Sequence, residues 1–178
     1  MPDIFHQFPV FAPAHEVFKA VSAPEGLDGW WTLSSKGEPA AGNIYELFFG
    51  EGYDWRARVT ECVPNELFEL EIYGSMPDWE NTRVRFELAE EGTSPVKSVE
   101  NSEGEVSEDG SGSSDEASLS ASSAQSAAET IVRFSHTGWP NDNDHYRISS
   151  FCWAMYLRLM KKYVEDGTVV EYSKRLDA

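Results

Sequence analysis

A tract without a single aromatic residue divides this chain, running from Glu90 to Glu129. Its 40 residues include 12 serines, and all 23 Phe, Tyr and Trp residues lie in the other 138. Ten acids and one lysine give the tract a charge of −9, about half of the net −17 of the chain. Such a composition cannot bury enough apolar surface to offset the entropy lost on ordering. We therefore expect residues 90–129 to be a disordered insertion, and the core to come from the remaining residues.

The two stretches that flank this tract have alternating polarity. NTRVRFELAE precedes it and TIVRFSHTG follows it, each with apolar residues at every second position. Alternation of this kind is typical of a half-buried strand. Without the tract, the two strands would be joined by a short turn. We interpret the tract as an insertion at the tip of a hairpin, within one domain that spans residues 1–178.

The remaining sequence predicts an α+β order of elements. A short helix is expected from Ala14 to about Ser22, because Pro13 suits an early helical position. A long helix is expected over about 143–165, capped by Asn or Asp of PNDNDH and ended by Gly167. Its apolar residues wrap most of its circumference, as expected for a helix gripped by a curved sheet. Strands are expected at 4–10 and at about 43–50, 53–63, 66–73, 82–89 and 130–136.

Four stretches resemble one known superfamily. EVFKAVSAPEGLDGWW is similar to the opening motif of START-like, or SRPBCC, proteins, in the branch named for the activator of heat-shock protein 90 ATPase. The likeness continues in ARVTECVPNELFEL, in RFSHTGWP and along the last helix at Trp153, Leu157, Met160 and Val164. It implies a helix-grip fold, in which a bent antiparallel sheet of about six or seven strands wraps the C-terminal helix. It also implies a deep, mostly apolar cavity that accepts a hydrophobic small molecule.

Strand alternation then gives candidates for the residues that line such a cavity. On the strand 53–63, for example, the inward phase is Trp55, Ala57, Val59 and Glu61. His136 and Trp139 would add polar groups to an apolar site, which is the usual composition of a small-molecule site. The complete set of candidate cavity residues is Trp31, Trp55, Glu61, Phe68, Leu70, Tyr73, Phe86, Phe134, His136, Trp139, Trp153 and Tyr156.

The adjacent tryptophans Trp30 and Trp31 pose a local question. Pro24 and Gly26 are expected to break the chain before them, and neighbouring side chains on an extended segment point to opposite faces. One indole would then anchor the core while the other, for which we favour Trp31, faces the cavity mouth. In the alternative interpretation, both indoles simply shield the sheet edge and the short helix.

Glu61 also has two interpretations. A carboxylate in the inward phase of a strand must be hydrogen-bonded, paired or close to water. It is either a polar anchor or general base for a ligand, or one half of a salt bridge to an arginine. The candidate partners are Arg56, Arg58 and Arg85. We favour the salt bridge over catalysis, and we assign no residue as catalytic.

Charge and motifs exclude several other classes. Only 14 Lys and Arg oppose 31 Asp and Glu, which is the wrong balance for nucleic acid or an anionic membrane. The scattered histidines lack HExxH or HxH spacing, and Cys62 and Cys152 are interpreted as buried, reduced thiols, so no metal or cofactor is expected. No GxSxG, P-loop or GxGxxG motif is present. Without a signal peptide or a run of 18 apolar residues, a cytoplasmic protein is expected.

Three functions remain, in decreasing order of preference. The first is a binding module for a hydrophobic or aromatic small molecule. The second is a cyclase- or aromatase-like enzyme that uses the same cavity, with Glu61 and His136 as its acid–base pair. The third is a chaperone-interacting protein, as the family name suggests. A chain of such high negative charge is expected to be a monomer.

Overall fold

The computed structural model describes residues 2–91 and 128–177. In this part of the chain, seven strands form one sheet, and three α-helices and one 3-10 helix accompany it. The predicted disorder of residues 90–129 lies outside the described residues, except at the ends of the tract. The elements are β1 (Ile4–Val10), α1 (Ala14–Ser22), α2 (Pro24–Trp30), β2 (Ser34–Lys36), β3 (Ile44–Phe48), β4 (Asp54–Val63), β5 (Leu67–Tyr73), β6 (Arg83–Glu91), β7 (Glu129–Thr137), α3 (Asp144–Asp166) and η1 (Tyr172–Lys174).

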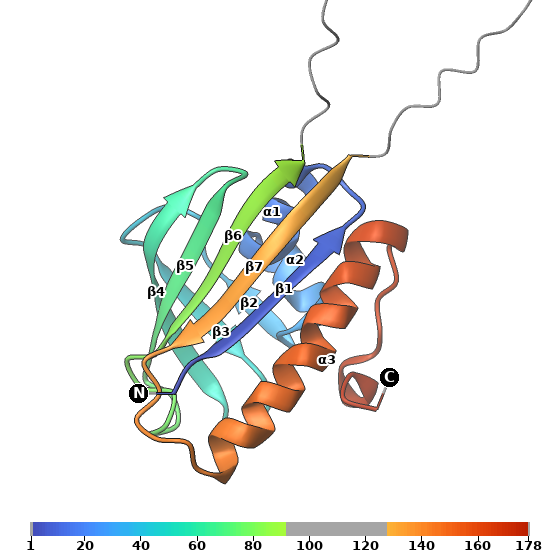
Figure 1. The fold of residues 1–178 in the computed structure, drawn as a ribbon. Coiled ribbons are helices and arrows are strands. Elements are labelled where there is room, and N and C mark those ends of the chain that lie inside the picture. The colour runs from blue at the N-terminus through green and yellow to red at the C-terminus, as the bar shows by residue number, and fades with distance from the viewer. Residues whose placement is uncertain (1, 92–127, 178) are drawn as a thin grey trace, which may run out of the picture. The chain divides into compact units, whose positions relative to one another are not determined.

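The sheet is antiparallel throughout, with the strand order β1-β7-β6-β5-β4-β3-β2. It curves strongly, and the helices α1 and α2 lie inside the curve while α3 runs beside the edge strand β1 (Figure 1). The strands β6 and β7 pair from Arg83 with Thr137 to Glu91 with Glu129, so the aromatic-free tract connects two adjacent strands. This arrangement is the α+β order that the sequence predicts and the helix-grip fold that the family resemblance implies.

The long helix α3 begins and ends as its sequence predicts. The Asn143 side chain accepts a hydrogen bond of 2.9 Å from the Tyr146 backbone N–H, and Gly167 ends the helix with a φ of 72°. The sheet does not cover all of the apolar residues of the helix, however. Ile148 and Phe151 are 60% and 68% exposed, because one flank of α3 faces away from β1 and the sheet.

The segment before the two tryptophans is a helix, not the break that Pro24 and Gly26 predict. Pro24 stands at the first position of α2, where its missing N–H costs no hydrogen bond. Gly26 is needed because α1 and α2 touch there: a Cβ atom would lie 2.5 Å from the Lys19 carbonyl oxygen and 2.6 Å from that of Ala20. The two breakers therefore begin a helix and allow it to pack closely.

Because of α2, Trp30 and Trp31 do not point to opposite faces. Trp30 is the last residue of the helix and Trp31 caps it, and both are buried. Their rings stack with centroids 6.0 Å apart and planes at 20°. The Trp30 indole N–H donates to the Ala20 carbonyl at 2.9 Å, which fixes it in the core.

The sequence gives no signal for β2, since its residues SSK are polar and few. This strand forms because it pairs with β3, from Ser34 with Phe48 to Lys36 with Glu46. Pairing rather than propensity determines such a short edge strand.

We predict that Gly26→Ala destabilises the protein although alanine is the better helix former. Helix propensity alone would stabilise α2 by about 1 kcal/mol. The clash with the α1 backbone should instead lower the free energy of unfolding by about 1–3 kcal/mol. Urea denaturation measures the difference. Glu25→Ala, on the exposed side of the same helix, is the matched control and should change stability by no more than about 0.5 kcal/mol. Equal stability of Gly26→Ala and the unmodified protein would contradict the close contact.

Candidate ligand-binding cavity

Aromatic side chains occupy the space between the sheet and α3. The Trp153 ring lies 4.5 Å from that of Phe134, 5.1 Å from that of Trp31 and 5.9 Å from that of Trp79, measured between centroids. Trp153 itself is 1% exposed. Indole side chains therefore fill the middle of the space between the sheet and α3, where the family resemblance implies a deep cavity.

A chain of hydrogen bonds crosses this interior through His136. The Trp153 indole N–H donates to His136 Nδ1 at 2.9 Å, and His136 Nε2 lies 2.9 Å from Thr82 Oγ1. The Thr82 hydroxyl donates in turn to the Trp79 carbonyl at 2.7 Å. Because an indole N–H can only donate, Nδ1 must be an unprotonated acceptor and Nε2 must carry the proton. The chain thus joins α3 to the sheet through a neutral imidazole.

Burial holds His136 in this neutral form. The side chain is fully buried, and this desolvation, together with the charge of nearby His145, lowers the pKa of His136 to about 3. Protonation would also place a second N–H against the Trp153 indole N–H. Both effects favour a structural role for His136 over proton transfer.

A large cavity lies at one end of this aromatic interior. Its volume is about 450 Å³, and a smaller hollow of about 50 Å³ adjoins it beside Trp31 and Trp153. Its walls come from the end of α2, the β3–β4 hairpin, the β5–β6 loop, the first half of α3 and the C-terminal segment. The lining residues are Trp31, Phe49, Tyr53, Trp55, Met76, Trp79, His145, Ile148, Ser149, Cys152, Tyr156, Tyr172 and Leu176. We call this space the aromatic cavity.

One stripe of α3 forms the more polar wall of the aromatic cavity. His145, Ser149, Cys152 and Tyr156 follow one another at spacings of three or four residues, which places them along one helix face. Burial raises the pKa of Tyr156 to about 12, and it also raises the pKa of the Cys152 thiol. Both groups are therefore neutral at pH 7, which suits an apolar ligand.

His145 is held in place by a loop of the sheet. Its Nδ1 lies 3.0 Å from Asp78 Oδ2, and the Asn143 side-chain amide donates to the same oxygen at 3.2 Å. These hydrogen bonds, that of His145 first, lower the pKa of Asp78. The His145 ring also packs edge-on against Trp139, with centroids 5.7 Å apart. The imidazole at the cavity wall thus has a defined orientation.

The C-terminal segment completes the cavity wall. It turns back along α3 after Gly167 (Figure 1), and Arg175 anchors it. The buried guanidinium donates to the carbonyls of Val170, Thr32 and Asp28 at 3.0, 2.9 and 2.6 Å. The Tyr172 hydroxyl donates to the Phe49 carbonyl at 2.7 Å. These bonds hold Tyr172 and Leu176 beside the cavity.

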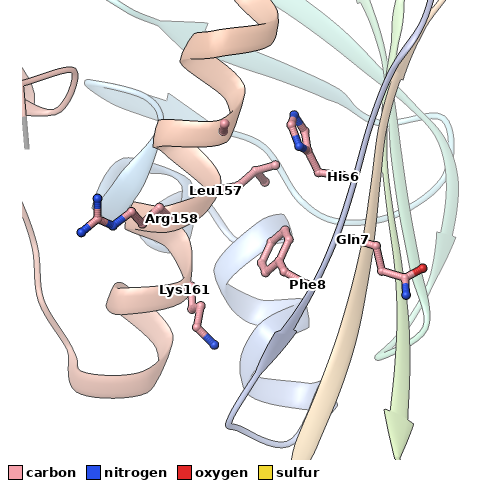
Figure 2. A pocket seen from close by; sticks show the side chains of 7 residues that line it. His6, Gln7, Phe8, Leu157, Arg158 and Lys161 are labelled. Carbon is pink, nitrogen blue, oxygen red and sulfur yellow. The ribbon is translucent and has the colours of Figure 1, made fainter.

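A second pocket, of about 270 Å³, lies between β1 and α3. In Figure 2, His6 and Phe8 point from the strand toward Leu157 of the helix, while Gln7 and Arg158 point away. Burial lowers the pKa of His6, and His6 Nε2 has no hydrogen-bond partner within the described ranges. We call this pocket the lateral notch. It has fewer aromatic walls than the aromatic cavity and contains none of the candidate residues.

The candidate residues fall into three groups. Four line the aromatic cavity or the hollow beside it: Trp31, Trp55, Trp153 and Tyr156. Six are buried elsewhere in the interior, where they pack rather than face the aromatic cavity: Phe68, Leu70, Phe86, Phe134, His136 and Trp139. The last two, Glu61 and Tyr73, lie on the other face of the sheet.

The inward placement of Glu61 is wrong because β4 contains a β-bulge. Val59 pairs with Leu70 but Glu61 pairs with Glu69, so Thr60 is an extra residue and the alternation reverses after it. The Glu61 carboxylate is exposed and accepts a hydrogen bond of 2.8 Å from Arg85. It is thus paired with one of the three arginines considered, and it lies on the opposite face from His136.

Tyr73 is misplaced for a simpler reason. It follows the buried Ile72 on β5, so its ring points to the outer face, where the Arg58 guanidinium lies 6.0 Å from the ring centroid. Strand alternation alone was sufficient to exclude it from the interior.

The sequence patterns did not identify most of the other residues that line the aromatic cavity. Trp79 stands in the turn-rich stretch SMPDWENT, where an aromatic residue among loop formers is the available clue. His145 and Ser149 belong to α3. Apolar residues lie all around this helix, so the sequence pattern does not show which face lines the cavity. Tyr172 and Leu176 follow the last predicted element, and only the folded chain brings them to the cavity.

The fold and the cavity define the class of protein: a START-like, helix-grip protein. The family model of the Activator of Hsp90 ATPase homolog 1-like protein matches residues 11–165, and the chain belongs to that family. Among curated proteins, none matches this chain in sequence.

Solved structures with the same fold are similar over nearly the whole chain. The Aha1 dimer from Colwellia psychrerythraea is 24% identical, with a TM-score of 0.66 over 94% of this chain and 99% of that one. CalU16 from Micromonospora echinospora is 15% identical, with a TM-score of 0.60 over 98% and 81%. DynU16, from the dynemicin biosynthetic locus, is 17% identical, with a TM-score of 0.60 over 94% and 48%. At these identities, the likeness shows the fold.

No three His, Cys, Asp or Glu side chains in residues 2–91 and 128–177 lie close enough together to hold a metal ion. None of the helices within these ranges is long and apolar enough to cross a membrane.

We predict that the protein loses stability as the pH falls below about 6.5, in part through His136. The unfolded chain takes up a proton near pH 6.5, whereas folded His136 resists protonation down to about pH 3. The free energy of unfolding should fall by about 2 kcal/mol between pH 6.5 and 5 from this residue alone. His6, whose pKa is also lowered, contributes with the same sign.

Urea denaturation between pH 7 and 5 measures this slope. His136→Gln should reduce it, whereas His15→Gln, at an exposed position of α1, should leave it unchanged. An equal slope in the protein and in His136→Gln would contradict a neutral, buried His136.

Proposed function

We propose that this protein binds a hydrophobic or aromatic small molecule in the aromatic cavity. The observation that carries the proposal is an open, apolar hollow with a volume typical of small-molecule sites. Seven of its thirteen lining residues are Trp, Tyr or Phe, and none is Asp, Glu, Lys or Arg. Burial of flat apolar surface is thus the main source of affinity that the site offers.

The rim of the aromatic cavity supports the same conclusion. Tyr53, Met76, Ile148 and Leu176 are all more than a third exposed, and each lines the cavity. Apolar side chains that gather around a hollow, rather than scatter over the surface, are typical of a ligand site. A ligand would cover surface that is otherwise in contact with water.

The relatives give the proposal a context. DynU16 is described by its place in a biosynthetic locus, which is compatible with a fold that handles small molecules. For this chain, we place the binding function in the cytoplasm, with a monomer as the active form. The Colwellia relative is a dimer, so the oligomeric state needs its own measurement by light scattering.

The enzyme-like alternative requires Glu61 and His136 as an acid–base pair, and these two side chains do not meet. Glu61 is on the outer face, and both His136 nitrogens are engaged in the interior. The chaperone alternative would use the surface of the protein, and it becomes an outcome of the binding experiment.

We predict that 2-methoxynaphthalene, a neutral aromatic compound, binds in the aromatic cavity. Titration of the isotope-labelled protein should shift the side-chain signals of Trp31, Trp55 and Trp79, because these indoles form the wall. Cys152→Phe should abolish the shifts by filling the cavity. Ala154→Phe, two residues further on α3, fills the lateral notch instead and should leave them unchanged.

The reverse result, with binding lost only in Ala154→Phe, would move the ligand to the lateral notch and contradict the proposal. No clustered shifts with any of a panel of aromatic and lipid compounds, together with shifts on addition of an Hsp90-type chaperone, would move the function to the protein surface.

A further inference from the structure

The aromatic cavity has one polar corner, at the start of α3. Within the described residues, the structure records no hydrogen bond for His145 Nε2 or for Ser149 Oγ, and both side chains line the cavity. Ser149 follows His145 by four residues and so lies directly after it on the same helix face. A ligand that enters the cavity therefore meets two uncommitted polar groups beside each other.

The contacts of His145 determine which kind of group it can bind. Asp78 accepts a hydrogen bond from Nδ1 and is held by a second one from the cap residue Asn143. Since a carboxylate only accepts, Nδ1 must carry the proton of the imidazole. In the neutral ring, Nε2 is then a hydrogen-bond acceptor, and the contact with Trp139 maintains its direction.

We infer that the ligand of the aromatic cavity is an aromatic molecule with a hydroxyl group, of the phenol or enol class, whose O–H donates to His145 Nε2. This inference rests on the proposed function and specifies its ligand. The ring of the ligand packs against the wall of indoles, and Ser149 offers a second hydrogen bond to the same oxygen.

Charge argues against the other head groups. A carboxylate or phosphate would find no Lys or Arg on the cavity wall, and the Arg175 guanidinium is engaged by three carbonyls. An ammonium group would find no carboxylate on the wall, because Asp78 lies behind His145. A neutral hydroxyl satisfies the acceptor without placing a net charge among aromatic rings.

The test compares 2-naphthol with its methyl ether, 2-methoxynaphthalene, by isothermal titration calorimetry. The two compounds share one ring system, and the ether is the more apolar, so burial alone favours the ether. We expect 2-naphthol to bind about tenfold more tightly, as for one hydrogen bond to a partly buried acceptor. His145→Phe, which retains a ring without an acceptor, should reduce this ratio to about one. His15→Phe, on the exposed face of α1, is the matched control and should preserve the ratio.

The two compounds separate failure of this inference from failure of the proposed function. If both bind equally to the unmodified protein, or if His145→Phe retains the preference, the inference is wrong and the binding function stands. If neither binds, the proposed function fails as well. Should His145→Phe not fold, Asp78→Asn gives the second variant: loss of the carboxylate should reduce the preference severalfold while binding of the ether persists.

Discussion

The interior of this protein depends on one buried hydrogen-bonded chain, from the Trp153 indole through His136 to Thr82 and the Trp79 carbonyl. It joins α3, β7 and the β5–β6 loop, which are far apart in the sequence. Each polar group in this network has a hydrogen-bond partner. Burial of the network therefore orients its side chains without leaving any of its own donors unpaired. Because the network requires a neutral His136 imidazole, the stability of the protein also depends on pH.

The same hydrogen-bonded network helps to explain where the interior leaves space for a ligand. It fixes the Trp153 indole, whose ring stacks with that of Trp79 in the middle of the helix-grip interior. The remaining space is displaced to the end of α3, where Trp31 and Trp55 meet the C-terminal segment. The space that the fold leaves open is therefore an aromatic hollow with one polar corner.

Several local features follow directly from the residues. Alternation predicts the strands and, for β5, β6 and β7, the residues that face the core. The cap at Asn143 and the stop at Gly167 are properties of a few neighbouring residues, so α3 could be located from sequence. The family motifs then supplied the topology, because strand order depends on contacts between distant segments.

Other features depend on contacts that the linear pattern does not record. A bulge at Thr60 reverses the phase of β4 and moves Glu61 to the outer face, although the residues themselves give no sign of an extra position. Pro24 and Gly26 have the character of chain breakers, yet the packing of α1 makes them the start of a helix.

The sequence by itself determined most of the strands and the limits of α3, because these depend on local periodicity and capping residues, and its family motifs indicated the helix-grip class. The tertiary structure decided which aromatic side chains fill the interior and which remain at its open end. It also brought Trp79, His145 and Tyr172 into one wall from three segments. The physical reason is that a binding site is made of surfaces left over after packing, and packing is settled by contacts between residues that are distant along the chain.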